Sequence, residues 1–380
     1  MFTTNNSNKQ GGRNIAYVAV KGGKIAIEQS ILRLKQERLL SGTAAKVKTI
    51  ENSMRLLIDQ VMSEGSIYCP SLAALAIKQA EGSMEEAVFL LRAYRSTLPR
   101  RYYSTTVESS DMQIERRISA AFKDIPGGQI LGTSYDYTHR LLDFELMDES
   151  DEQIQKILRQ FKAEDEETAP APETMRMPKV TDYLRSQGLI APVKQDDTQP
   201  QDATKETLTF PCPRSMRLQI LTRGMTQAVT ALGYASLRGY GVAHPTVCEL
   251  RVGRLPVTIA DPANAEDEEN EYVIGEIKAT EVESLIPVTR QDEDGRKQIG
   301  FEIGYGIAIG QNETKAIAMS ILDQCLMHPE SNFATSDEEF VLYHVDSIEA
   351  TGFISHLKLP HYVTFQAKLN SARKVREEQA

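Results

Sequence analysis

Helical periodicity in the first third of the chain is the feature that most constrains the fold. Between Lys24 and Arg101, four segments carry apolar residues at three- and four-residue spacing: KIAIEQSILRLKQERLL, TIENSMRLLIDQVMSEG, PSLAALAIKQA and SMEEAVFLLRAYRSTL. Pro70 suits the first turn of a helix, and Ser83 and Glu86 have the spacing of a capping box. These segments predict an N-terminal helical layer.

The hydrophobic period changes in the last third of the chain. CELRVGRLPVTIA and EYVIGEIKATEVESLI alternate as strands do, and GFEIGYGIAIG indicates a strand followed by the helix NETKAIAMSILDQCLM. Before them, MRLQILTRGMTQAVTALGYASLRGYG has a helical pattern that ends at glycines. A helical layer followed by a mostly antiparallel sheet with helices predicts an α+β fold rather than a doubly wound sheet.

Composition divides the chain into candidate domains. A length of 380 residues predicts two or three folding units. Residues 1–14 predict a disordered tail, residues 15–150 a mainly helical domain with a basic segment, and residues 207–380 an α+β domain. The acidic, proline-rich residues 151–206 predict a linker. We also expect a β-rich start in IAYVAVKGG, an acidic loop in DPANAEDEENE, and an amphipathic island, VTDYLRSQGLI, that docks from within the linker onto a neighbouring part.

Charge and composition exclude several classes of protein. The net charge of −10 opposes non-specific binding to nucleic acid, while a local basic segment suits one small polyanion. No apolar run approaches the ~20 residues that cross a bilayer, and the polar first residues form no signal peptide. The four cysteines are far apart in sequence, which predicts free thiols in a reducing cytosol. We therefore expect a cytoplasmic protein.

The densest group of polar residues surrounds a Pro-Gly-Gly turn in ERRISAAFKDIPGGQILGTSYDYTHR. Basic side chains hold phosphate oxygens well, and the candidates for this role are Arg116, Arg117 and Lys123. Candidate catalytic groups, acting as acid, base or positioning residue, are Asp124, Asp136 and His139. The alternative is structural: a charged helix, DMQIERRISAAFKD, followed by a tight turn.

Two glycine-containing segments add further candidates. RGYGVAHP places Arg238, a candidate substrate-binding residue, and His244, a candidate catalytic residue, in one loop, although an ordinary surface loop has the same composition. GYGIAIGQNETKA resembles a strand-to-helix turn whose amides meet an anion. It lacks the lysine of a phosphate-binding loop, so the alternative is that its glycines let a strand and a helix pack closely.

His356 and His361 form the sharpest local pattern, SHLKLPH. On a regular helix they would point apart, because each residue turns the chain by about 100°. Pro360 disfavours helical geometry at Leu359, so an irregular loop can bring both imidazoles to one metal ion. Two histidines leave the remaining ligands to water, substrate or another chain. The alternative is a pair of ordinary loop histidines.

Taken together, these segments resemble the PhnI family, the I subunits of carbon–phosphorus lyase. The resemblance is carried in family order by YVAVKGG, VMSEG, ALAIKQA, FLLRAYRSTL, ERRISAAFKDIPGGQILGTSYDYTHRLLDF, FPCPRSMRLQ, RGYGVAHP and DEEFVLYHVDSIEATGFISHLKLPHYVTFQ. It covers most of the chain from Tyr17 to about Leu369. The departures are the N-terminal extension, the linker and the acidic loop, and none of them removes a motif named above.

The resemblance implies an enzyme of phosphonate catabolism. In this family an alkylphosphonate displaces adenine from C1′ of MgATP, which gives α-D-ribose 1-methylphosphonate 5-triphosphate when the substrate is methylphosphonate. The isolated subunit resembles a nucleosidase, in which water replaces the phosphonate and ribose 5-triphosphate forms. The implied partners are the G, H and J subunits of the core, with the ATPase-like K and L subunits. The resemblance also implies a metal role, with zinc expected, for His356 and His361 at a face against the J subunit.

A different class of function stays open beside the enzyme. The chain can serve chiefly as a non-catalytic scaffold whose interface with its partners forms the site. Activity of the purified single chain discriminates between the two.

Overall fold

The computed structural model describes residues 23–167, 177–192, 198–241, 244–262, 271–291 and 297–379. The chain forms two compact units: one combines Met1–Lys46 with Ile348–Ala380, and the other is Val47–Ser347. Several predicted features lie outside the described residues: the tail, the β-rich start up to residue 22, residues 168–176 and 193–197 of the linker, and residues 263–270 of the acidic loop.

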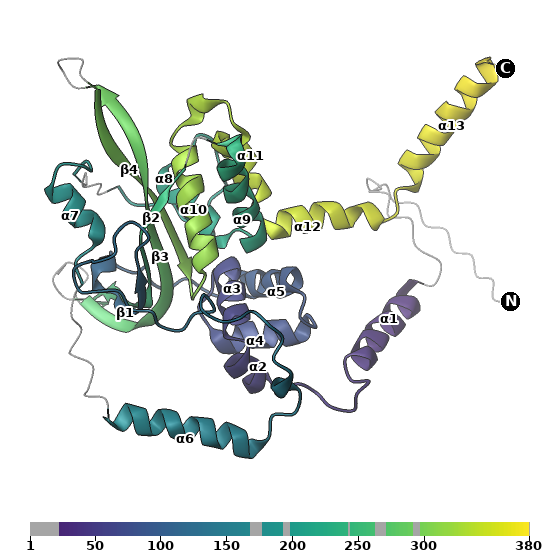
Figure 1. Ribbon diagram of the computed structural model, residues 1–380. Helices are drawn as coiled ribbons and strands as arrows, with labels where there is room; N and C mark the ends of the chain where they lie inside the picture. Colours follow the sequence, from purple (N-terminus) through teal and green to yellow (C-terminus); the bar gives the residue numbers. More distant parts are fainter. Residues whose placement is uncertain are drawn as a thin grey trace. The chain divides into compact units, whose positions relative to one another are not determined.

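The larger unit begins with a helical layer, which confirms the prediction for three of the four segments; the first, KIAIEQSILRLKQERLL, forms a helix that belongs to the smaller unit instead. The layer consists of α2 (Val47–Ser53), α3 (Arg55–Gly65), α4 (Pro70–Gln79) and α5 (Met84–Ser96), which pack on one another (Figure 1). Pro70 occupies the first turn of α4. Ser83 caps α5, because its Oγ accepts a hydrogen bond from the amide of Glu86 at 3.4 Å. Apolar side chains at helical spacing, such as Val61 and Val88, are completely buried between the helices.

A four-stranded antiparallel sheet of order β1-β2-β3-β4 forms the centre of this unit (Figure 1). Its strands are β1 (Gln113–Ile118), β2 (Thr246–Ala260), β3 (Glu271–Gln291) and β4 (Lys297–Ile309). The predicted strands of the last third correspond to β2, β3 and β4, and the α+β class is confirmed. Among the described residues β1 and β4 are the edge strands.

Helix α10 (Glu313–Leu326) packs closely on β3 and β4 because β4 has glycines where the helix crosses it. A Cβ atom on Gly304 would lie 2.0 Å from the carbonyl oxygen of Ser320, and one on Gly306 would lie 2.0 Å from that of Ala316. The glycines of GYGIAIG therefore serve close strand–helix packing, as the structural alternative predicted.

Two further helices, α8 (Arg214–Arg223) and α9 (Thr226–Ala235), pack against α10, and α11 (Glu338–His344) packs against α8. Their apolar faces form a shared core around Met216, Leu221 and Met319. The short elements are a π-helical turn, η3 (Ser236–Tyr240), and the 3₁₀ turns η1 (Ser109–Asp111), η2 (Phe144–Met147), η4 (Pro329–Ser331), η5 (Ala334–Ser336) and η6 (His356–Lys358).

One prediction from the sequence is wrong: DMQIERRISAAFKD contains the strand β1, not a helix. Gln113–Ile118 pair antiparallel with β2, with a register shift between Ile114 and Arg116. Helical propensity is a weak preference, and here it is overridden by pairing with β2 and by buried partners for both arginines.

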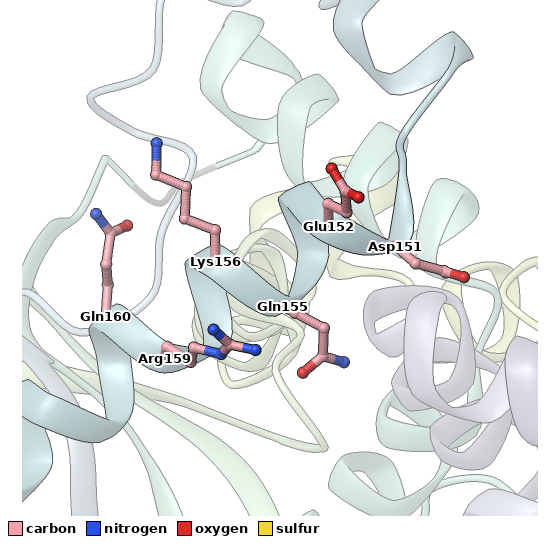
Figure 2. A pocket seen from close by; sticks show the side chains of 6 residues that line it. All are labelled: Asp151, Glu152, Gln155, Lys156, Arg159 and Gln160. Atoms are coloured by element: carbon pink, nitrogen blue, oxygen red, sulfur yellow. The ribbon is translucent and has the colours of Figure 1, made fainter.

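The segment predicted as a linker contains two helices. Six residues at the start of α6 (Asp151–Glu167) line a shallow hollow along the helix (Figure 2). All six belong to one helix, so this hollow offers no converging groups from a second element. The amphipathic island forms α7 (Val180–Ser186), and its docking is confirmed, since Val180 and Leu184 are buried against the side of the sheet that carries Cys248 and Leu285.

The smaller unit contains α1 (Gly23–Glu37), nearly all of α12 (Ser347–Ser355), η6 and α13 (Tyr362–Gln379). No residue of α1 or α13 is buried, and large apolar side chains such as Ile25 and Phe353 are more than two thirds exposed (72% and 73%). No helix of the described residues combines the length and the apolar character of a membrane span.

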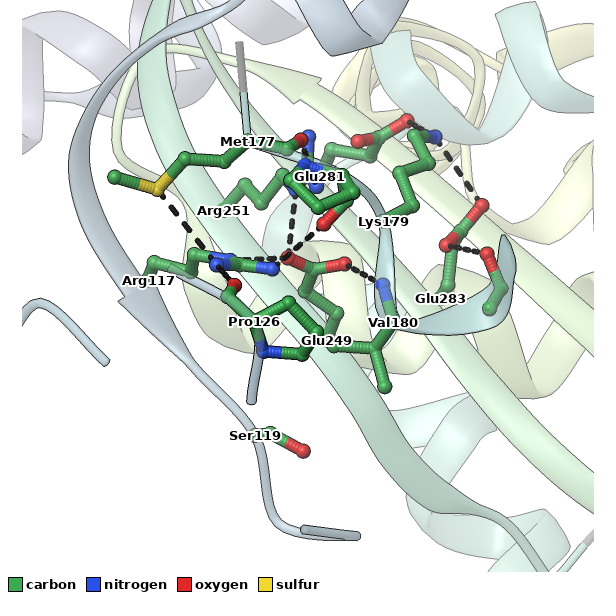
Figure 3. A network of polar contacts seen from close by, with 12 residues as sticks. Arg117, Ser119, Pro126, Met177, Lys179, Val180, Glu249, Arg251, Glu281 and Glu283 are labelled. Carbon is green, nitrogen blue, oxygen red and sulfur yellow. Dashed lines mark hydrogen bonds and ion pairs between the residues drawn. The ribbon is translucent and has the colours of Figure 1, made fainter. Parts of the chain in front are cut away.

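A network of buried charges joins the sheet to the segment that leads into α7 (Figure 3). Glu249 on β2 accepts from Nε of Arg117 at 2.5 Å and from Nε of Arg251 at 2.8 Å, and its second oxygen accepts from the amide of Val180 at 2.9 Å. All three charged side chains are 1% exposed or less. Nη1 and Nη2 of Arg117 donate to the carbonyl oxygens of Pro126 and Pro178, which anchors two loops to β1.

Beside it, Lys179 lies between two carboxylates of β3, 2.8 Å from Glu281 and 3.2 Å from Glu283. Burial raises the pKa of both carboxyl groups, but Lys179 outweighs burial at Glu281 and holds its pKa below the usual value. The pKa of Glu283 stays raised because burial and the neighbouring Glu281 prevail.

Removing the shared carboxylate should strongly destabilise the larger unit. We predict that Glu249→Ala lowers the free energy of unfolding by about 3–5 kcal/mol, because it leaves two arginines buried without their counter-ion. Chemical denaturation measures the change. The exposed Lys123→Ala variant serves as control and should stay within about 0.5 kcal/mol of the parent protein. Equal stability of the two variants would contradict the role given to the network.

Candidate functional site

A cavity of about 460 Å³ lies at the beginning of α10. We call it the α10 cavity. Four parts of the chain line it: the first turns of α3, the segment 133–140, Thr226 at the start of α9 and the residues around the start of α10. Its charged side chains are Arg55, Asp136, Arg140, Glu313 and Lys315. The segment 133–140 belongs to the motif that carries most of the polar candidates predicted from the sequence.

Gln311 connects three parts of the α10 cavity: α3, the segment 133–140 and the start of α10. Its Oε1 accepts from Nη1 of Arg55, and its Nε2 donates to the carbonyl oxygen of Thr133 at 2.9 Å and to Glu313 at 2.8 Å. Gly310 precedes Gln311 and adopts the left-handed conformation (φ +73°), which glycine favours. A Cβ atom on Gly310 would lie 2.4 Å from the side chain of Asp59, so only glycine fits here.

Two of the predicted site residues meet at the wall of this cavity. Arg116 is buried, and its Nη2 lies 2.5 Å from Asp136 while its Nε lies 3.0 Å from Glu313. A hydrogen bond with Ser134 lowers the pKa of Asp136, and the charge of Arg116 lowers it further. Asp136 is therefore an ionised carboxylate that suits a base or a cation-positioning group rather than a proton donor.

Lys315 lies behind the cavity and is completely buried. Its Nζ donates to the carbonyl oxygen of Thr222 at 2.5 Å and to Oγ of Ser63 at 3.4 Å. Burial lowers the pKa of Lys315 to about 8, so this amine exchanges a proton close to physiological pH. An anion bound in the cavity would stabilise its charged form.

The other predicted polar residues lie elsewhere. Arg117 is enclosed in the buried network, where protein groups take its donors. The exposed candidates are Lys123, Asp124, His139, Arg238 and His244. Arg238 lies 6.0 Å from the centre of the Tyr234 ring. None of these six lines the α10 cavity, and their functional roles stay predictions.

Three cations of the cavity are absent from the candidates predicted from the sequence: Arg55, Arg140 and Lys315. Arg140 ends the motif that contains Asp136 and His139, and its place in that motif was the available signal. Arg55 and Lys315 lie in helical patterns, where their charges do not differ from those of a solvated helix face.

The two predicted metal ligands do come together. The ring centroids of His356 and His361 are 5.5 Å apart. Nδ1 of His356 lies in hydrogen-bond contact with the carbonyl oxygen of Phe353, and that of His361 lies 2.6 Å from the carbonyl oxygen of Leu359. A carbonyl partner assigns the proton to Nδ1, which leaves each Nε2 as an acceptor. Among the described residues, no group of three or more His, Cys, Asp or Glu side chains is arranged to hold a metal ion.

Comparison with known proteins gives consistent matches. A family model described as "Bacterial phosphonate metabolism protein (PhnI)" matches residues 16–379. The chain is 42% identical to a putative C-P lyase subunit protein, HtxH, of Stutzerimonas stutzeri over 96% of this chain and 97% of the relative. Two relatives carry the name alpha-D-ribose 1-methylphosphonate 5-triphosphate synthase subunit PhnI. That of Escherichia coli (strain K12) is 42% identical over 96% of this chain and 99% of the relative, and that of Rhizobium meliloti (strain 1021) is 41% identical over 95% of each.

The buried lysine predicts a specific pH dependence of stability. The folded protein releases the proton of Lys315 near pH 8, whereas the unfolded chain keeps it up to about pH 10.5. The unfolded state therefore binds more protons in this window, and the contribution of Lys315 to stability should rise with pH, by up to about 3 kcal/mol. The measurement is the difference in unfolding free energy between the parent protein and Lys315→Met from pH 7 to pH 10.5. If the unfolding free energies of the two proteins changed in parallel with pH, burial would not lower the pKa of Lys315.

Proposed function

The chain belongs to the PhnI family of bacterial phosphonate metabolism proteins, and from this premise we propose that it is a subunit of α-D-ribose 1-methylphosphonate 5-triphosphate synthase in the carbon–phosphorus lyase system. The observation that supports the proposal is the identity of 41% and 42%, over nearly the full length, to two relatives that carry this name. We further propose that the α10 cavity is its nucleotide site.

The proposed reaction exchanges one bond at C1′ of the ribose of MgATP. The bond from C1′ to the adenine nitrogen breaks, and adenine leaves with the bonding electrons and gains a proton. A phosphonate oxygen then forms the new bond to C1′. The centre passes through an oxocarbenium-like state, as in glycoside cleavage. With water in place of the phosphonate, the same step gives ribose 5-triphosphate.

The chemistry of the α10 cavity supports this assignment. Arg55 and Arg140 supply guanidinium groups for phosphate oxygens, and the buried Lys315 adds a further positive charge when protonated. Asp136 and Glu313 supply the one or two carboxylates that a phosphate-bound Mg²⁺ takes from a protein. Arg116 forms ion pairs with both carboxylates, so their positions are fixed before a substrate binds. The polyanion contacts proposed for Arg117 and Lys123 are less favoured, because neither lines the cavity.

One observation favours the scaffold as a second candidate function. Directly after the cavity-lining segment, Leu141 and Leu142 are 82% and 83% exposed, and Phe144 is 72% exposed. Contiguous apolar side chains of this kind mark surfaces that a partner covers. The G, H and J subunits are the proposed core partners, with K and L joining them. If the chain acts as a scaffold, the active site is completed only within the complex.

We propose that zinc is bound at His356 and His361. The paired imidazoles support this, since both present Nε2 while Nδ1 is held by a carbonyl oxygen, the arrangement usual in metal-binding histidines. Two nitrogen ligands do not complete a tetrahedral site, so the J subunit, substrate or water supplies the others. When bound, zinc would polarise a phosphate or phosphonate oxygen.

The first prediction of this proposal concerns activity. The purified chain should release adenine slowly from MgATP, as measured by chromatography. Removing the charge of one phosphate contact costs roughly 1.5–3 kcal/mol, so Arg140→Ala should lower the rate tenfold or more. Arg159→Ala, on the exposed face of α6, is the matched control and should leave the rate unchanged. Adenine at background from the single chain, with an active assembled complex, would favour the scaffold.

The second prediction concerns the metal. The complex assembled with wild-type chain should contain zinc, and His356→Ala combined with His361→Ala should lose it. His344→Ala removes another exposed histidine and should retain full metal content. Binding should weaken below about pH 6, because a protonated imidazole cannot bind a metal. Equal zinc in all three complexes, measured by elemental analysis, would show that the pair has no metal role.

A further inference from the structure

A second cavity, of about 630 Å³, lies at the edge strand β4. We call it the β4-edge cavity. Its apolar wall is formed by Ile190, Phe301, Ile303 and Met327, which come from the segment after α7, from β4 and from the end of α10. The amide of Phe301 donates to the carbonyl oxygen of Leu189 at 3.0 Å, so the segment after α7 is fixed along β4. The volume is within the range of about 300–1,000 Å³ that small-molecule sites occupy.

Two guanidinium groups line this cavity, and their donors are only partly used. Nη1 of Arg185 is shared between Asp182 at 2.7 Å and Thr181 at 3.3 Å, while its Nε is buried without a hydrogen-bond partner among the described residues. Arg214 gives Nε and Nη2 to Asp323, at 2.9 and 2.5 Å, and its side chain stays 44% exposed. The Arg185 side chain lines the cavity and stays 22% exposed, so its positive charge can attract an anionic oxygen there.

Hydrogen-bond acceptors line another part of the same cavity. Glu302 is fixed by Nε2 of Gln324 at 2.6 Å and by Nε2 of His328 at 3.1 Å. The Glu302 side chain is 24% exposed and lines the cavity, so it places a carboxylate acceptor beside a bound ligand. Burial lowers the pKa of His328, but its contacts with Glu302 and Glu330 outweigh this and raise it, which favours the charged imidazole.

We infer that the β4-edge cavity binds a purine nucleoside monophosphate. The base lies flat against Phe301 with its amino group toward Glu302, and the phosphate contacts Arg185 and Arg214. A triphosphate suits the cavity less well, because Asp323 already neutralises Arg214 and two lining carboxylates, Glu283 and Glu302, would repel a larger negative charge.

This site is distinct from the α10 cavity and independent of the proposed function. One cavity lies at the beginning of α10 and the other at its end, and a helix of 14 residues is about 21 Å long. A single nucleotide therefore does not occupy both. Failure of the adenine-release assay leaves the inference intact, and failure of the inference leaves that assay intact.

The test is equilibrium binding of AMP, adenine and ribose 5-phosphate to the full chain by titration calorimetry. AMP should bind at least tenfold more tightly than either fragment, because it uses both halves of the cavity. Arg185→Gln and Phe301→Leu should each weaken AMP binding about tenfold, and thermal unfolding should confirm that both variants are folded. Phe301→Leu keeps an apolar side chain in the partly buried position but removes the aromatic face.

The matched control is Arg159→Gln on the exposed face of α6, which should leave AMP affinity unchanged. Loss of AMP binding in Arg140→Gln, with Arg185→Gln unaffected, would place the nucleotide in the α10 cavity and overturn the inference. Absence of AMP binding to the parent protein would do so as well. Equal affinity for AMP and ribose 5-phosphate would reduce the cavity to a simple anion site without base recognition.

Discussion

The ion cluster around Glu249 is the interaction on which the arrangement of the larger unit depends. One carboxylate on β2 neutralises Arg117 of β1 and Arg251 of its own strand, and it also accepts the amide of Val180 at the start of α7. Buried ion pairs of this kind add little net stability, but they tolerate very few alternative arrangements. The cluster therefore fixes the register of β1 and the place of the chain segments before and after it.

The two neighbouring arginines of β1 have different roles: Arg117 stabilises the core, and Arg116 positions side chains of the candidate site. Arg117 turns into the buried cluster, and through its donors to Pro126 and Pro178 it holds the turn after β1 and the entry to α7. Arg116 points to the other side, where it holds Asp136 and Glu313 at the α10 cavity. Glycines on β4 let α10 approach the sheet closely enough for Glu313 to reach that arginine. The site thus depends on the same short strand as the core.

Sequence reasoning succeeded where a periodic pattern reflects burial. The helices of the N-terminal layer, β2 to β4 and the docking of α7 all follow from apolar spacing. It failed at β1, because a strand whose buried side chains are arginines looks like a charged helix. On β3, Glu281 and Glu283 are buried as well as Val282 between them, although alternation alone would assign the glutamates to the solvent face. Both cases need partners that lie far away in sequence: Glu249 for β1 and Lys179 for β3. Within the candidate site, Asp136 and Arg116 were found from the density of polar residues, but Lys315 has its altered pKa only through burial.

The α10 cavity is the site that we propose for the triphosphate of the nucleotide. A crystal structure of the chain with Mg²⁺ and a slowly cleaved ATP analogue tests it most directly. We expect electron density for the triphosphate against Arg55 and Arg140, with the metal ion close to Asp136 or Glu313. A fully occupied analogue bound anywhere else on the chain, with the α10 cavity filled only by water, would contradict it.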